Sequence, residues 1–246
     1  MMTNYKMTLS YDGTRYRGWQ KQGNTPDTLQ EKTETVLSRL LEQTVEVNGC
    51  GRTDAGVHAR MQVCSFRADT DMSPDELRAK LNRYLPEDIG CLALEAAPPR
   101  FHARLNCREK TYVYRIWTGE QPDIFDRKYR FTFTEPLDTD KMKKAAELLT
   151  GTHDYRAFTT AAHMKKSTVR TVTGIRLEKD GDELRLIFTG DGFLYNMVRI
   201  LTGTLLEVGT GKRAPGEMPA LLESKDRALA GFTAPPHGLI LWDIRY

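Results

Sequence analysis

The chain has 246 residues, enough to bury a substantial core as one large domain or as two closely packed halves. Its 36 basic and 33 acidic residues leave a net charge of only +3, so any nucleic-acid signal has to be local. No stretch approaches 18 uncharged apolar residues, and the first residues lack the pattern of a signal peptide. We therefore expect a cytoplasmic protein without a membrane span.

Cysteine and histidine spacing argues against a metal or a disulfide framework. The four cysteines are widely separated and form no C-x-x-C pair, and the five histidines show no metal-ligand spacing. The run Gly209-Thr210-Gly211-Lys212-Arg213 resembles a phosphate loop but lacks the preceding glycine and the following Ser or Thr. The sequence thus predicts reduced, mostly buried thiols, no metal and no cofactor.

The first half reads as alternating strands and helices. A capping box at Thr28 and Glu31 begins one helix, and Ser73, Pro74 and Glu76 begin another. Alternating or short apolar runs mark the strands between them. In chain order we expect a strand at 5–11, a helix at 27–43, strands at 45–48 and 62–67, a helix at 73–85 and a strand at 89–94.

The second half repeats this rhythm. We expect a strand at 111–117, a helix at 138–149 closed by Gly151, strands at 167–177 and 183–188, a helix at 193–208 ending at Gly209, a short helix at 215–224 and a strand at 239–244. Each half then has the order β-α-β-β-α-β of a ferredoxin-like unit. The halves, 1–103 and 104–246, lack a low-complexity linker between them, so the predicted fold is α+β with one shared sheet.

The most informative stretch is Gly49-Cys50-Gly51-Arg52-Thr53-Asp54-Ala55-Gly56-Val57-His58-Ala59. It places a carboxylate, Asp54, two residues after an arginine and between flexible glycines. An aspartate beside a fixed cation stays ionised, which makes Asp54 a candidate nucleophile or base.

Two segments concentrate positive charge beside aromatic groups. Residues 100–115 hold five basic residues and one acid, and residues 161–176 hold four basic residues and no acid. Such segments suit a phosphate backbone and an unstacked base, although solvated strand faces explain the charge equally well.

Three further features have both a structural and a functional interpretation. Tyr112 shares one side of its predicted strand with Lys110, and strand tyrosines more often pack in a core than against a ligand. Arg199 lies beside the apolar stripe of its predicted helix, where it either faces solvent or reaches a site carboxylate. The segment 11–20, rich in Gly, Trp and Gln, is either a hairpin exit or a ligand-facing loop.

With these pieces in place, the whole chain resembles the TruA family of bacterial tRNA pseudouridine synthases. The resemblance rests on motifs in the family's order, of which Gly51-Arg52-Thr53-Asp54-Ala55-Gly56-Val57-His58 is the most specific. The others are Tyr11-Asp12-Gly13 through Gly18-Trp19-Gln20, Phe101-His102-Ala103-Arg104, Lys110-Thr111-Tyr112-Val113-Tyr114-Arg115, Val169-Arg170-Thr171, Phe193-Leu194-Tyr195-Asn196-Met197-Val198-Arg199 and Thr233-Ala234-Pro235-Pro236-His237-Gly238-Leu239.

The resemblance implies a role for each matching residue. Asp54 stands at the catalytic aspartate, Arg199 at the arginine that pairs with it, and Arg52 at the arginine implicated in flipping the nucleotide. Tyr112 stands where a tyrosine packs against the target base. The remaining candidate RNA contacts are His58, Gln20, Arg104, Arg108, Lys110, Lys165 and Lys166.

The resemblance also implies a fold and a substrate. The family has two ferredoxin-like halves around a continuous antiparallel sheet with a basic cleft between them, and it works as a homodimer. It isomerises uridines in the tRNA anticodon stem-loop, at positions 38–40, without a cofactor. The alternatives are a synthase for another RNA, such as ribosomal RNA, and a catalytically silent RNA-binding or tRNA-folding protein.

Overall fold

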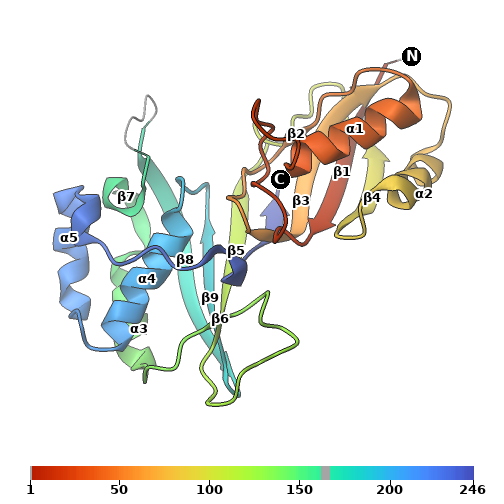
Figure 1. Ribbon diagram of the computed structural model, residues 1–246. Coiled ribbons are helices and arrows are strands. Elements are labelled where there is room, and N and C mark those ends of the chain that lie inside the picture. Colours follow the sequence, from red (N-terminus) through yellow and green to blue (C-terminus); the bar gives the residue numbers. More distant parts are fainter. Residues whose placement is uncertain (1, 162–166) are drawn as a thin grey trace. The chain divides into compact units, whose positions relative to one another are not determined.

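A computed structural model describes residues 2–161 and 167–246, which form two compact units. The first unit comprises Met1–Arg108 and Ile240–Tyr246, and the second comprises Glu109–Leu239 (Figure 1). Both combine helices with a mostly antiparallel sheet, which confirms the predicted α+β class. The last residues of the chain therefore belong to the first unit and not to the half that precedes them in sequence.

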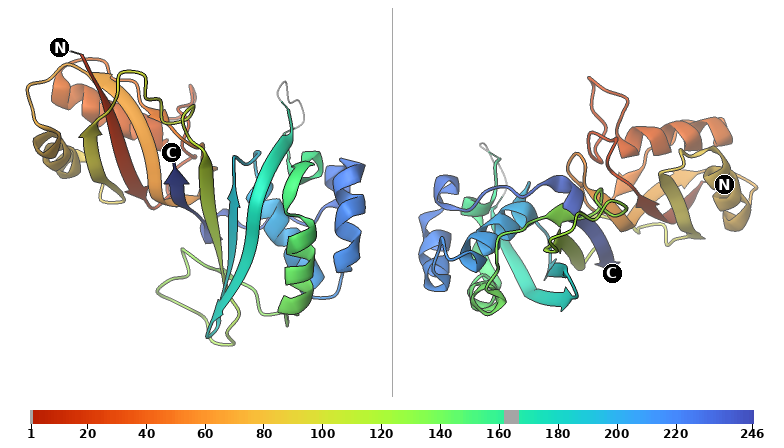
Figure 2. Two further views of the ribbon diagram at one scale, coloured as in Figure 1. Left: turned by 180° about the vertical axis from the view of Figure 1, so that it is seen from behind. Right: turned by 60° about the horizontal axis from the view of Figure 1, so that its bottom comes forward.

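The first unit has the predicted order of elements. In chain order they are β1 (Thr3–Tyr11), α1 (Leu29–Leu41), β2 (Asn48–Gly49), β3 (His58–Ala68), α2 (Pro74–Tyr84) and β4 (Ile89–Ala96). The strands pair antiparallel in the order β4-β1-β3-β2, which is the arrangement of a ferredoxin-like unit. Both helices lie on one face of this sheet, as Figure 2 shows from a second direction. A final strand, β10 (Leu239–Arg245), adds to β3 in parallel through Ile240 and Leu241.

The helix starts of the first unit follow their capping signals. The Thr28 side chain accepts from the Glu31 backbone N–H at 3.3 Å, and the Ser73 side chain accepts from that of Glu76 at 3.3 Å. Glu76 Oε2 accepts from the Ser73 backbone N–H at 2.8 Å, which completes a capping box at this helix. At the helix where the box was predicted, the Glu31 carboxylate instead contacts Lys21. The caps satisfy backbone donors that the first helical turn leaves unpaired.

The strand predicted at 45–48 is wrong except at its last residue. The alternating apolar side chains are indeed buried, but β2 contains only Asn48 and Gly49. Two side chains of α1 take the backbone donors that a strand would use. Ser38 Oγ accepts from the Val45 N–H at 3.0 Å, and Glu34 Oε1 accepts from the Val47 N–H at 2.9 Å. Periodicity predicted the burial correctly but could not reveal the competing acceptors.

The second unit is built on an antiparallel sheet in the order β5-β9-β8-β7. Its elements are β5 (Glu109–Trp117), β6 (Phe131–Thr132), α3 (Thr139–Leu148), β7 (Gly151–Asp154), β8 (Val169–Asp180), β9 (Glu183–Gly190), α4 (Met197–Gly209) and α5 (Met218–Ser224). The three helices gather on one face of the sheet (Figures 1 and 2). The short strands β6 and β7 were not predicted, and β6 pairs with β5 in parallel. In the described part of the second unit, short 3₁₀ segments lie at Arg156–Phe158, Pro215–Glu217, Arg227–Leu229 and Pro236–Gly238.

Helix α4 differs from its prediction in both extent and burial. It begins at Met197, four residues later than predicted, and eleven of its thirteen residues are buried. It therefore runs through the core instead of resting one apolar stripe on the sheet. The left-handed glycine after it is Gly211, with φ of 77°, and Gly209 is the last helical residue. Gly151 likewise has a positive φ of 128° but already belongs to β7.

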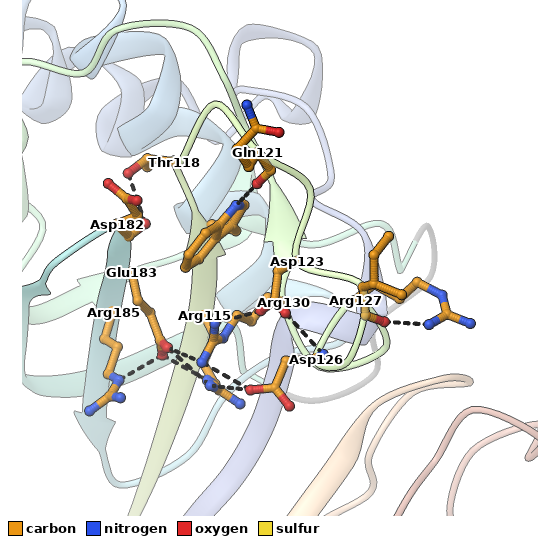
Figure 3. Close-up of polar contacts among 12 residues, drawn as sticks. Arg115, Thr118, Gln121, Asp123, Asp126, Arg127, Arg130, Asp182, Glu183 and Arg185 are labelled. Carbon is orange, nitrogen blue, oxygen red and sulfur yellow. Dashed lines mark hydrogen bonds and ion pairs between the residues drawn. The ribbon is translucent and has the colours of Figure 1, made fainter.

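An ion cluster around the buried carboxylate of Glu183 ties the long connection after β5 to the sheet (Figure 3). Arg115 donates to both carboxylate oxygens of Glu183 at 2.7 and 3.0 Å, and Arg130 lies 2.7 Å from the same carboxylate. Burial alone would raise the pKa of Glu183, but hydrogen bonds from Arg115 and Arg185 outweigh it and lower the pKa to about 2. Arg115 belongs to the basic segment 100–115, but its positive charge is paired with Glu183 within the fold.

The cysteines agree with the prediction of mostly buried thiols. Cys50, Cys64 and Cys91 are buried, Cys107 is partly exposed, and no disulfide joins these four described cysteines. No helix among residues 2–161 and 167–246 is long and apolar enough to cross a membrane. Within the same residues, no group of three His, Cys, Asp or Glu side chains could hold a metal ion.

Candidate active site

The motif around Asp54 forms a loop between β2 and β3. Along it, Arg52 is exposed, Thr53 is buried and Asp54 is partly exposed, so the aspartate is accessible while its neighbour anchors the backbone. Gly56 has φ of 78°, and the Val57 N–H donates to the Asp54 carbonyl at 3.1 Å. The loop is thus a tight turn in which glycine supplies a conformation that other residues rarely adopt.

The segment that follows β1 packs directly on this loop. The Trp19 N–H donates to the Thr53 carbonyl at 3.0 Å, and the Tyr11 hydroxyl lies 2.8 Å from Thr53 Oγ1. A Cβ on Gly18 would stand 2.8 Å from the Thr53 carbonyl oxygen. A Cβ on Gly13 would meet the Val57 carbonyl oxygen at 2.0 Å. Both glycines are therefore required for contact with the Asp54 loop.

Two predicted RNA contacts, His58 and Gln20, have partners within the first unit. His58 is only 3% exposed, and its Nδ1 accepts from the Gly13 N–H at 3.0 Å and lies 3.1 Å from Asp12 Oδ1. A ring enclosed in this way offers little surface to a ligand and serves to hold the turn. Gln20 donates through Nε2 to Gln30 Oε1 at 2.8 Å.

A cavity of about 740 Å³ lies beside Gln20, between α1 and residues 44–48. Its lining carries the acids Glu31, Glu34 and Glu46, as well as Lys21 and Arg39. Three carboxylates make it a poor match for a phosphate backbone, and Asp54 is not among its lining residues.

Arg52 and Arg104 are brought close enough to interact. Partial burial lowers the pKa of Arg52, and the positive charge of Arg104 lowers it further. Two guanidinium groups that repel one another gain by sharing an anion, so this pair is suited to a phosphate. Arg108 is also exposed, and its backbone N–H donates to the Arg245 carbonyl at 2.9 Å.

Tyr112 lies in the core-facing row of β5 in the second unit. It is 7% exposed, stands opposite Phe188 in the sheet and meets Phe193 edge to face at 5.3 Å between ring centroids. Packing of this kind fixes the ring while leaving a small part of it accessible. Lys110, two residues before it, is partly exposed.

Arg199 projects from the first turn of α4 and is held by two oxygen acceptors. Its Nε donates to the Ala234 carbonyl at 2.6 Å and its Nη1 to Asn196 Oδ1 at 2.8 Å. Burial raises the pKa of Tyr114, and the charge of Arg199 opposes that rise, which places the two side chains close together. The guanidinium is therefore oriented by the fold, as an arginine that pairs with a carboxylate would need to be.

The predicted contacts fall into separate groups. Asp54, Arg52 and Arg104 belong to the first unit, and Tyr112, Lys110 and Arg199 belong to the second. Lys165 and Lys166 lie outside the described residues.

The sequence patterns did not indicate a role for Gln62, a fully buried residue of β3 that donates a hydrogen bond to the Gly51 carbonyl. The sequence offers little signal for it, because β3 also contains Arg60, Ser65 and Arg67, and composition does not show which polar side chain is buried and requires partners.

The family model and the similar proteins indicate the same family. The model of the family described as tRNA pseudouridine synthase matches residues 7–106 and 145–246. The chain is 44% identical over 245 residues to tRNA pseudouridine synthase A of Bacillus sp. (strain KSM-64), with all of both chains covered. It is 42% identical, again with both chains fully covered, to tRNA pseudouridine synthase A 2 of Bacillus anthracis and to tRNA pseudouridine synthase A of Clostridium acetobutylicum.

Proposed function

Because the chain belongs to the tRNA pseudouridine synthase family and isomerises uridine to pseudouridine in tRNA, we propose that its targets lie in the anticodon stem-loop, at positions 38–40, and that Asp54 is the nucleophile. The observation that carries the second part is the Asp54 loop itself. It holds a partly exposed carboxylate on a backbone fixed from both sides.

The reaction needs no oxidant or reductant. The bond from C1′ to N1 of uracil breaks, the base turns, C1′ bonds to C5, the proton on C5 leaves and N1 gains a proton. A carboxylate such as that of Asp54 can start this sequence by attacking the base, by attacking the sugar or by taking the C2′ proton. Each route requires the base to leave its stack first, at a cost of a few kcal/mol.

We assign the remaining steps to residues of both units. Tyr112 packs against the flipped uracil, and Arg199 pairs with the Asp54 carboxylate and keeps it ionised. Arg52 and Arg104, whose charges interact, hold the phosphates beside the flipped nucleotide, and Arg108, Lys110, Lys165 and Lys166 extend the contact. Its burial gives His58 a positioning role in place of an RNA contact.

The assembly and location follow from the same proposal. The protein acts as a homodimer in the cytoplasm, where its tRNA substrates are. Sedimentation of the purified protein at micromolar concentration tests the dimer, and a species of 28.0 kDa alone would contradict it.

The substrate proposal is tested with purified protein and unmodified transcripts. Pseudouridine is mapped in a tRNA carrying uridines at 38–40, in the same tRNA with cytidines there, and in ribosomal RNA. We expect modification of the first transcript alone. Pseudouridine in ribosomal RNA, or at another site of the cytidine-substituted tRNA, would contradict the proposal that the targets lie at positions 38–40.

A further inference from the structure

A buried glutamine holds the backbone that leads to Asp54. Gln62 is 0% exposed on β3, where it stands opposite Leu9 of β1. Its Nε2 donates to the Gly51 carbonyl at 2.7 Å, and its Oε1 accepts from the Gly51 N–H at 3.3 Å. One amide therefore satisfies both backbone groups of a residue that is itself buried.

The position of Gly51 makes this contact important for the site. It lies three residues before Asp54 and directly before Arg52. Preceding it, the Cys50 N–H donates to the Val63 carbonyl at 2.8 Å, and after Arg52 the Thr53 side chain meets Tyr11. The Gln62 contact completes this series, so the backbone from 50 to 53 is attached to the sheet at successive points.

We propose that Gln62 is a positioning residue for pseudouridine formation, holding Gly51 so that the carboxylate of Asp54 meets the target uridine. The proposal rests on the proposed function of Asp54. It does not require Gln62 to touch the RNA. A displacement of about 1 Å in a catalytic group can cost about 10²-fold in rate, so loss of this contact affects chemistry more than binding.

The first unit offers a matched control of the same residue type. Gln43 also clamps one residue's backbone, donating to the Asp69 carbonyl at 2.7 Å and accepting from the Asp69 N–H at 3.0 Å. Asp69 follows the other end of β3 from the one that the Asp54 loop enters. Gln43→Met therefore removes an amide clamp with the same hydrogen-bond pattern, at a partly exposed position, without disturbing the loop.

The test compares Gln62→Met with Gln43→Met on the same tRNA transcript. For Gln62→Met we expect a single-turnover rate about 10²-fold lower, with the Kd for tRNA within about threefold of wild type because phosphate contacts carry the affinity. Gln43→Met should change neither quantity. A wild-type single-turnover rate in folded Gln62→Met, or an equal loss in Gln43→Met, would overturn the proposal.

Gln62→Glu provides a second readout if the methionine variant does not fold. A protonated glutamic acid can donate to the Gly51 carbonyl and accept from its N–H, whereas the ionised form can only accept. Full burial raises the pKa of such a carboxyl, so the rate should be retained at low pH and fall as the carboxyl ionises, a limb that wild type lacks. A pH–rate profile identical to that of wild type would contradict the positioning role.

Failure of the proposed function gives a different result. If Asp54→Asn still forms pseudouridine, the nucleophile is misassigned, whatever Gln62→Met does. If Asp54→Asn is inactive while folded Gln62→Met is fully active, only the positioning role is rejected.

Discussion

The two units hold their proposed site residues by different physical means. In the first unit, the Asp54 loop is fixed by a few hydrogen bonds with buried side chains, such as those of Tyr11 and Gln62. In the second unit, Tyr112 stands on a core strand and Arg199 on a helix whose residues are almost all buried. The loop therefore depends on a few directional bonds. In the second group, apolar packing sets the strand and the helix that carry the two residues, and hydrogen bonds then orient only the Arg199 guanidinium.

This difference predicts which substitutions lower the reaction rate and which lower the free energy of unfolding. Changing a partner of the loop should lower the rate with a modest effect on unfolding, because each net hydrogen bond contributes only about 1 kcal/mol. In the second unit, the single-turnover rate should fall when Tyr112 or Arg199 itself changes. Substitution of the proposed phosphate contacts there, such as Lys110, should weaken tRNA binding, and substitutions in the core should act on stability.

The largest expected effect is that of Asp54→Asn. Removing a nucleophile typically costs at least about 10⁴-fold in turnover, and a partly exposed, isosteric substitution should leave unfolding unchanged. Single-turnover formation of pseudouridine measures the loss, and filter binding measures the retained affinity for tRNA. Measurable turnover by this variant would remove Asp54 from its assigned role.

Arg199→Leu comes next, with an expected loss of about 10²-fold in rate. The variant also loses the hydrogen bonds to Ala234 and Asn196, which should lower the free energy of unfolding by about 1–3 kcal/mol. The matched control is Arg213→Leu, since Arg213 similarly donates to the Leu229 carbonyl at 2.8 Å and to Glu207 at 3.1 Å. The control should lose stability alone, and an equal loss of rate in both variants would show that only folding is affected.

Glu183→Gln tests the second unit through its free energy of unfolding. The folded-state pKa of Glu183, about 2, lies below its ordinary value of 4.5, so its stabilisation is complete above pH 4.5 and is lost as pH falls toward 2. The variant should be about 1–3 kcal/mol less stable at pH 7, because it leaves Arg115 and Arg130 poorly paired. Urea unfolding between pH 7 and pH 3 should also show a flatter pH dependence than wild type, and parallel curves would contradict the assignment.

Tyr112→Phe has the smallest expected effect, about tenfold in single-turnover rate if the hydroxyl relays a proton. The ring keeps its contact with Phe193, so tRNA affinity should not change. Tyr155→Phe is the control, because its hydroxyl donates to the Leu149 carbonyl at 2.7 Å within the same unit. An unchanged rate in Tyr112→Phe would restrict Tyr112 to packing.

The elements with local signals were predictable from the sequence. The helix starts at Thr28 and Ser73 follow from side chains that cap their own first turns, and the turn at Gly181 joins the predicted strands β8 and β9. The extent of the strand predicted at 45–48 was not predictable, because side chains of the preceding helix, Ser38 and Glu34, accept from the Val45 and Val47 N–H groups. The burial of α4 on all sides also required knowledge of what packs around it.

The proposed site residues come from the motif resemblance, whereas the contacts that support them come from the structure. Asp54 remains the proposed nucleophile, and its side chain is partly exposed beside the buried Thr53. Gln62 and Tyr11 were missed as partners, because hydrogen bonds between residues far apart in sequence leave no periodic signal. The motif alone could not show whether His58 is buried or contacts RNA, because a histidine at this position is compatible with either role.

The most direct test of the account is a structure of the Asp54→Asn variant bound to a tRNA with uridine at position 39. The account predicts the flipped uracil within about 4 Å of both the residue at position 54 and the ring of Tyr112, with Arg199 beside the substituted side chain. A uracil that contacts only residues of Met1–Arg108, or one that remains stacked in the anticodon stem, would contradict it.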